Sequence, residues 1–275
     1  MAEQPSLTRR LFTLRAPPPP TLKKVLGALG VLLVLALWWL LTLGATPESR
    51  IVSPVILPSP GEVLRSIPAL LGERALLQSA AATLQRVITG FGLAIVVGVP
   101  LGIFAGAYRI FDALTGPLSV FLRNIPIAVL IPLTILWFGI DETQKTMFIF
   151  IATVPFVFFD TVRAIASVHD RYVETAQTLG ANPGQIIGKV LIPLALPDIY
   201  NSLRNLFGLA FGYIMLAELV NAEHGLGYLL MASQRRGLTE HIFAILIVIG
   251  LLAYGIDRVL YWFQRGLFPH RTDNE

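Results

Sequence analysis

The sequence predicts an all-α integral membrane protein with six transmembrane helices and one cytoplasmic helix–turn–helix. Of its 275 residues, 55% are hydrophobic and only 14% are charged, which is too few charges to cover a soluble globule of this size. Uncharged runs at 25–47 and 87–108 are each longer than the roughly 20 residues that cross a bilayer. Because lipid cannot satisfy open backbone groups, these runs should be helical. A soluble protein with a buried core is the alternative, but such domains rarely hold so many charge-free runs.

The first apolar run predicts an uncleaved membrane anchor at about 25–45, preceded by a cytoplasmic tail at 1–24. The run is longer than the apolar core of a signal peptide. Five basic residues and one acidic residue precede it, so the positive-inside rule places the N-terminus in the cytoplasm. Six spans would return the C-terminal tail, 266–275, to the same side.

An extracytoplasmic segment and five further spans should follow the anchor. The segment, 46–80, opens with prolines and continues into a short amphipathic helix at about 62–71. Span two is rich in glycine, which lets membrane helices approach closely, and span three is broken by Pro126 and Pro132. We expect these spans at about 82–106, 117–138, 145–165, 198–220 and 241–263.

A polar stretch at 166–197 separates spans four and five and predicts the cytoplasmic helix–turn–helix. Its first half has helical spacing but is too polar to cross a membrane, and Ala-Asn-Pro-Gly at 181–184 breaks it. A second helix with an apolar stripe follows and should end near Pro193. Pro193 and Pro197 should then interrupt the chain before span five. A short, two-faced knob of this kind suits a socket on another protein.

The residues of this knob resemble the signature loop of ABC-importer permeases. Glu174 is followed by Ala176 and Gly180, and then by Val190 and Pro193, at the spacing of that loop. In the family the loop docks into a cleft on the ATPase subunit. The residues that the resemblance assigns to ATPase coupling are Glu174, Thr175, Ala176, Gly180, Ala181, Val190 and Pro193. Thr175 stands where the family usually has alanine.

Four more motifs, in the same order, are similar to the nitrate/sulfonate/taurine group of these permeases. They are PSP with VL at 58–64, GVPLG at 98–102, RNIP to DETQK at 123–145, and AE with GLGY at 217–228. Asn124 and Asp141 depart from the group's usual residues. The resemblance covers about residues 55–265 and implies the type I ABC importer permease architecture, with a permease core at 81–265. It also implies a bacterial inner-membrane location, a second copy of the chain, two ATP-binding cassette subunits and an extracytoplasmic solute-binding protein.

Candidate residues for the translocation path or its gate come from spans three and five. They are Arg123, Asn124, Pro126, Met215, Glu218 and Asn221. If Arg123 faces the path it favours an anionic solute, and snorkelling to the cytoplasmic interface is the alternative. We expect Glu218 to pair with an arginine such as Arg86, as a structural or gating ion pair, since a bare carboxylate would repel an anion.

The sequence gives no sign of catalysis, of a metal site or of a nucleic-acid partner. Its four histidines are scattered, no nucleophile–base set is evident, and no Walker-type loop is present. We therefore expect no cofactor on this chain, with ATP and Mg²⁺ held by the partner ATPase. The predicted function is an ATP-driven importer permease that moves a sulfonate, taurine, nitrate or bicarbonate by alternating access, coupled through 174–193. A thiamine-precursor-like or aromatic solute, an uncoupled channel and a membrane-embedded enzyme remain as alternatives.

Overall fold

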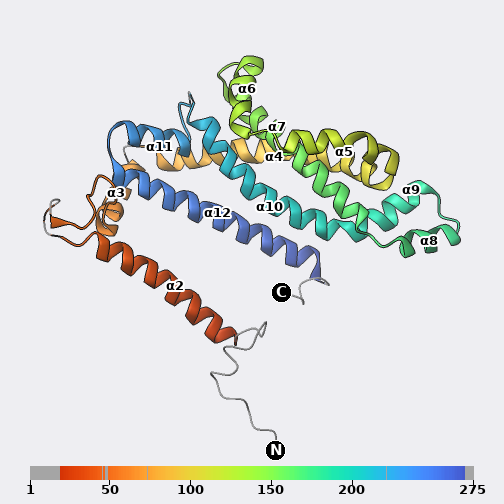
Figure 1. Ribbon diagram of the computed structural model, residues 1–275, viewed down its shortest axis with the longest axis horizontal. Coiled ribbons are helices and arrows are strands. Elements are labelled where there is room, and N and C mark those ends of the chain that lie inside the picture. The colour runs from red at the N-terminus through yellow and green to blue at the C-terminus, as the bar shows by residue number, and fades with distance from the viewer. Residues whose placement is uncertain (1–18, 45, 47–48, 73, 221, 270–275) are drawn as a thin grey trace, which may run out of the picture. The chain divides into compact units, whose positions relative to one another are not determined.

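The computed structural model describes residues 19–44, 46, 49–72, 74–220 and 222–269, and no strand occurs among them. They form two compact units, one ending at Ser66 and one beginning at Ile67 (Figure 1). The predicted all-α class is confirmed.

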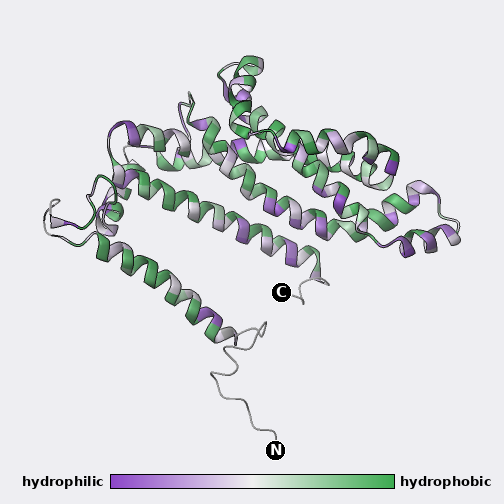
Figure 2. Ribbon diagram, viewed as in Figure 1, coloured by the Kyte–Doolittle hydropathy of each residue, from purple (hydrophilic) through white to green (hydrophobic). Residues whose placement is uncertain are grey.

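Within the ranges that the structure describes, five helices are long and apolar enough to cross a membrane. They are α2 (Pro20–Leu41), α4 (Leu76–Ala107), α7 (Glu142–Ala166), the helix Pro183–Glu218 that ends in α10 (Ile192–Glu218), and α12 (Thr239–Leu267). Their residues are predominantly hydrophobic, whereas polar residues gather on α8 (Asp170–Thr178) and at helix ends (Figure 2). Five of the six expected apolar spans are therefore present as single helices, although α4 begins before the predicted residue 82.

The sixth expected span, at 117–138, is not one straight helix. The chain forms α5 (Arg109–Arg123), a 3₁₀ turn at Ile127–Val129 and α6 (Leu130–Phe138), and the two parts are bent by 86°. Pro126 explains the break, because it has no N–H to donate and disfavours helical geometry at Ile125 before it. Pro132, the second expected break, lies inside α6.

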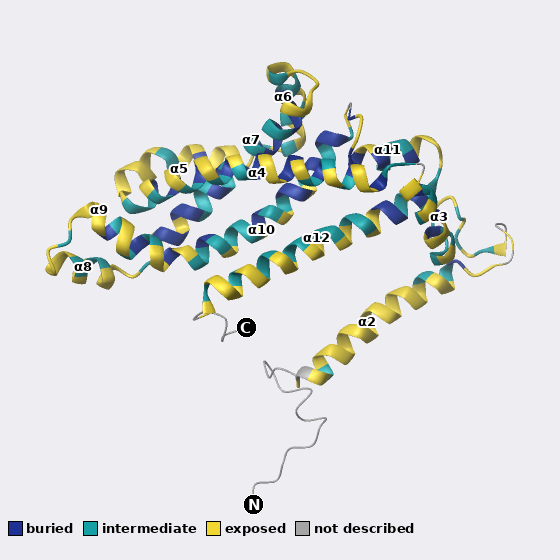
Figure 3. Cartoon of the chain, turned by 180° about the vertical axis from the view of Figure 1, so that it is seen from behind, coloured by how far each residue is buried: buried dark blue, intermediate teal, exposed yellow. Residues whose placement is uncertain are grey.

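Close packing of α4 on α7 forms the centre of the second unit (Figure 3). Small residues recur at every fourth position of α4, at Gly90, Ala94, Gly98, Gly102 and Gly106. A Cβ atom on Gly102 would lie 2.6 Å from the Cβ of Thr161, whereas one on Gly92 would meet no atom within 4 Å. The predicted close approach of helices is therefore confirmed at Gly102 but not at Gly92, and it is confined to one face of α4.

Helix α10 packs on α4 and α7, and α12 runs antiparallel beside α10 (Figure 1). Polar contacts join α10 to α12. Arg204 forms an ion pair with Asp257 at 2.6 Å, and the Tyr200 hydroxyl donates to the Leu260 carbonyl at 2.9 Å. A further helix, α11 (Leu226–Arg235), lies between α10 and α12 in the chain and was not foreseen.

The first unit contains the expected amphipathic helix, observed as α3 (Pro60–Gly72), which continues beyond the unit's end at Ser66. Ser59 and Glu62 cap its start reciprocally, since each backbone N–H donates to the other's side chain. Arg50 donates to both carboxylate oxygens of Glu62, at 3.0 and 2.8 Å. The Trp38 indole N–H donates to the Pro58 carbonyl at 2.9 Å, so this segment is tied to α2.

Candidate functional site

The predicted helix–turn–helix is present as α8 and α9 (Pro183–Ile186), joined by a four-residue turn, and we call residues 170–186 the α8–α9 hairpin. Gly180 adopts φ = +80°, a backbone conformation that favours glycine. Asn182 caps α9 with a reciprocal pair of bonds. Its side chain accepts from the Gln185 N–H at 2.9 Å, and its own N–H donates to the Gln185 side chain at 3.0 Å. The turn is therefore held in one geometry.

The inner face of the α8–α9 hairpin packs on the bundle. Val173, Ala176 and Ala181 lie against an apolar cluster that includes Ile165 of α7 and Ile186 of α9. Ala176 and Ala181, both predicted coupling residues, are thus half-buried and support the hairpin from within.

The outer face of the hairpin is exposed. Glu174, Thr175 and Gly180 all face solvent in this chain. Leu179 is 82% exposed. An apolar side chain that is exposed at the tip of a polar hairpin is typical of residues that a protein partner covers.

The predicted end of the second helix near Pro193 is wrong. The helix runs from Pro183 to Glu218 without a break, and residues Ile187–Leu191 form a π-helix inside it. The Ile192 N–H donates to the Ile187 carbonyl, five residues back. A proline inside an α-helix clashes with the carbonyl four residues before it, and the wider π turn gives Pro193 room. Val190 lies in this π segment, half-buried, while Pro193 is exposed.

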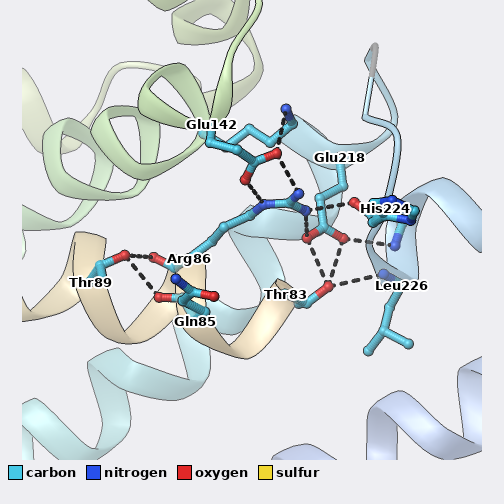
Figure 4. Close-up of polar contacts among 10 residues, drawn as sticks. Thr83, Gln85, Arg86, Thr89, Glu142, Glu218, His224 and Leu226 are labelled. Atoms are coloured by element: carbon cyan, nitrogen blue, oxygen red, sulfur yellow. Dashed lines mark hydrogen bonds and ion pairs between the residues drawn. The ribbon is translucent and has the colours of Figure 1, made fainter. Parts of the chain in front are cut away.

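A buried polar cluster lies at the opposite end of α10 (Figure 4). Arg86 donates to the carboxylate of Glu218 at 2.7 Å and to that of Glu142 at 2.7 Å. Its guanidinium also donates to the His224 carbonyl at 2.8 Å. Thr83 donates to Glu218 and accepts from the Leu226 N–H. The predicted pairing of Glu218 with Arg86 is confirmed.

This cluster joins four helices. Arg86 and Thr83 come from α4, Glu142 begins α7, Glu218 ends α10, and Leu226 begins α11. The Glu218 side chain is 0% exposed and that of Glu142 is 65% exposed, so Glu218 is enclosed by protein. Sequence reasoning missed Thr83, Glu142 and the His224 carbonyl, because only the fold brings them to Arg86.

Two glycines close the cluster. Gly225 has φ = +137°, and a Cβ atom there would lie 2.5 Å from the Glu218 carboxylate carbon. A Cβ atom on Gly227 would lie 2.8 Å from the Glu218 Cβ, and its N–H donates to the carboxylate at 2.9 Å. The Gly-Leu-Gly segment therefore covers the buried carboxylate.

The remaining path candidates are dispersed. Arg123 is the last residue of α5, at the bend, and its guanidinium lies 3.4 Å from the ring centroid of Phe159 on α7. Its Nε atom is buried and has no hydrogen-bond partner in the described part of the chain. Asn124 and Pro126 are exposed in the bend, and Met215 is half-buried on α10. Asn221 lies outside the described residues.

One open cleft of about 570 Å³ adjoins the α8–α9 hairpin. It lies between the α4–α5 connection, the end of α7 and the hairpin, and its polar lining includes Arg109, Asp112, Asp170 and Gln177. In the described ranges, no group of three or more His, Asp or Glu side chains could hold a metal ion.

Comparison with known proteins agrees with this architecture. The family model described as "binding-protein-dependent transport system inner membrane component" matches residues 98–272. The chain is 30% identical over 256 residues to the taurine transport system permease protein TauC of Escherichia coli K12, and the match covers 91% of each chain. It is 29% identical over 225 residues to the putative aliphatic sulfonates transport permease protein SsuC of Bacillus subtilis 168, covering 82% of each.

A solved structure shares the fold. The inward-facing MetNI methionine ABC transporter superposes with a TM-score of 0.62 at 23% identity, covering 70% of this chain and 95% of that chain. This likeness shows the type I ABC importer permease fold, as the sequence motifs implied.

Proposed function

This chain belongs to the family of binding-protein-dependent transport system inner membrane components, and we propose that it imports a small anion, driven by ATP hydrolysis on a partner subunit. The observation that carries the proposal is the α8–α9 hairpin. It is rigidly capped, packed on the bundle from within, and exposed at Glu174, Thr175 and Leu179. These features suit insertion into a cleft of a cytoplasmic ATPase.

The hairpin is mechanically continuous with the bundle. One unbroken helix leads from Pro183 to Glu218, so α10 alone spans about 40 Å at 1.5 Å per residue. A shift of the hairpin is thereby transmitted to the Arg86–Glu218 cluster at the far end. ATP binding shifts the permease between inward-open and outward-open states if the ATPase pair binds the two states with different affinity.

Two copies of the chain would form the path, with two ATPase subunits on the α8–α9 side and a solute-binding protein on the α11 side. The basic residues that precede the first span favour this orientation, with both termini in the cytoplasm. The relatives named for taurine and aliphatic sulfonates favour a sulfonate as the solute. Arg123 supports an anion, because its buried Nε has an unused hydrogen-bond donor at the bend of the broken span.

The coupling proposal is tested by purifying the complex with Glu174→Lys or Gly180→Asp. Aspartate tolerates positive φ better than most residues, so Gly180→Asp tests docking more than folding. We expect both variants to insert normally, to lose the copurifying ATPase and to lose uptake. Glu223→Lys is the matched control, since it reverses an exposed charge in the α10–α11 connection and should keep the ATPase. Normal uptake by both hairpin variants would favour an uncoupled channel instead.

The solute is tested in proteoliposomes that contain the whole complex and its binding protein. We expect uptake of radiolabelled taurine or an alkanesulfonate, with Arg123→Gln slowing uptake and Arg123→Lys retaining more of it. Transport of only a neutral aromatic compound, unaffected by Arg123→Gln, would contradict an anionic solute while leaving the coupling mechanism intact.

A further inference from the structure

Three guanidinium groups gather around one aromatic ring near the C-terminal end of α12. The guanidinium carbons of Arg204, Arg258 and Arg265 lie 4.8, 5.8 and 5.9 Å from the ring centroid of Tyr261. Of these, Arg204 is neutralised by its ion pair with Asp257. The ring face holds the cations in place through cation–π attraction.

The other two arginines add positive charge that the Arg204–Asp257 pair does not cancel, although Arg258 also attracts the Asp257 carboxylate. Arg258 and Arg265 are both exposed, and in the described part of the chain neither forms an ion pair with a carboxylate. They are two helical turns apart on α12 and therefore share a face, about 10 Å from each other along the axis. Arg258 also lies 5.7 Å from the Tyr254 ring centroid, so arginine and tyrosine alternate along this face.

This face lies where lipid headgroups would be. Arg265 is about 3 Å and Arg258 about 13 Å from the C-terminal end of α12, measured along the helix axis. That end is on the same side of the second unit as the start of α10 (Figure 1). Long arginine side chains at this depth reach the interface of the adjoining leaflet.

Apolar surface adjoins the charges. Trp262 is 69% exposed, Phe263 49% and Leu267 61%. Together with Arg265 and Gly266 they line a groove of about 470 Å³. A ligand that suits the whole surface is therefore an amphipathic anion, because a soluble anion would leave the groove unused.

We propose that Arg258, Arg265 and the adjoining groove bind an anionic phospholipid, with the phosphate between the two guanidinium groups and an acyl chain against Trp262 and Phe263. Anionic headgroups satisfy the excess positive charge, whereas a zwitterionic headgroup brings its own cation. Tyr261 orients the guanidinium groups before the lipid arrives, which reduces the entropy lost on binding. The site does not depend on the importer function.

The test uses Trp262 as the reporter. The chain has four tryptophans, so replacing Trp38, Trp39 and Trp137 by phenylalanine leaves Trp262 alone. The protein is placed in phosphatidylcholine nanodiscs that contain the same fraction of brominated phosphatidylglycerol or brominated phosphatidylcholine. We expect stronger quenching by the brominated phosphatidylglycerol. Arg258→Gln/Arg265→Gln should weaken the relative affinity for it about 30-fold.

Arg235→Gln/Arg236→Gln is the matched control, because it removes two exposed arginines at the end of α11 and should leave the preference unchanged. Equal quenching by the two lipids, or an unchanged preference in the Arg258/Arg265 variant, would overturn the proposal. Quenching by neither lipid would show that protein, such as a second copy, covers the face. Loss of the preference when millimolar inorganic phosphate is added would point to a soluble anion instead.

Discussion

Arg86 and Glu218 are 132 positions apart in the sequence, yet their side chains meet at 2.7 Å in the interior of the bundle. The same guanidinium also binds Glu142, whose side chain is 65% exposed, whereas that of Glu218 is 0% exposed. One arginine thus has a buried and an exposed carboxylate partner. The two partners differ in solvation, and their removal should have different consequences.

We expect Glu218→Ala to lower the free energy of unfolding by about 3–5 kcal/mol, because it leaves a buried guanidinium half-paired. Glu142→Ala should cost about 0–1 kcal/mol, since water can replace an exposed carboxylate. Denaturant titration of both variants in the same detergent measures the difference. Equal losses would mean that burial does not set the strength of these pairs.

The close contact between α4 and α7 predicts that glycines on the packed and open faces of α4 differ in how well they tolerate alanine. A Cβ atom on Gly102 would lie 2.6 Å from the Thr161 Cβ, so Gly102→Ala should destabilise the bundle by about 1–3 kcal/mol through overpacking. Gly92→Ala, on the same helix, meets no atom within 4 Å and should be neutral or stabilising. Thermal unfolding of the two variants should separate them, and a destabilised Gly92→Ala would contradict the packing explanation.

A substitution at Leu179 should distinguish docking of the α8–α9 hairpin on the ATPase from folding of the chain. It is 82% exposed at the tip of the α8–α9 hairpin, so Leu179→Ser should change stability by less than about 0.5 kcal/mol. We expect the same variant to retain much less ATPase on purification, because it removes apolar surface that the partner would cover. Leu77→Ser, at a leucine that is 71% exposed near the start of α4, is the control. Full ATPase retention by Leu179→Ser would show that the tip makes no energetically important contact.

The π-helix predicts that ATPase coupling depends on the helical register between the α8–α9 hairpin and α10. Deleting Gly188 should convert the π turn to an α-helix and rotate the α8–α9 hairpin by about 100° relative to α10. We expect this deletion to abolish coupled ATPase activity while the chain still inserts. Gly188→Ala keeps the register and adds a Cβ that meets no atom within 4 Å, so it should remain coupled. A coupled deletion variant would show that the hairpin orientation is not critical.

The Arg50–Glu62 ion pair predicts that the stability of the fold depends on pH. The bonds from the Arg50 guanidinium and the Ser59 N–H lower the pKa of Glu62 from 4.5 to about 2. Because the folded-state pKa is lower than the unfolded one, this carboxylate stabilises the fold fully above about pH 4.5, and the stabilisation is lost as the pH falls towards 2. Carboxyl carbon NMR should find the Glu62 midpoint near 2 in the native chain and well above it in Arg50→Gln. An unchanged midpoint in that variant would exclude Arg50 as the cause.

The sequence by itself determined the all-α membrane class, the apolar spans, the presence of the helix–turn–helix before span five and the family. Lipid exposure depends on composition over about 20 residues, and the family motifs are contiguous, so neither requires knowledge of distant contacts. It also suggested Arg86 as a partner for Glu218, because a buried carboxylate in a span needs a counter-charge.

Only the tertiary structure decided how the charges group and where helices continue. The Arg86 cluster draws on four helices, and Arg204 of α10 joins the arginines of α12 at Tyr261, so local spacing does not reveal either full group. Pro126 ends a helix while Pro193 lies in a continuous one, although both are prolines in apolar surroundings. The difference depends on whether the neighbouring turn can widen and on what packs against it, and packing is a property of the folded chain.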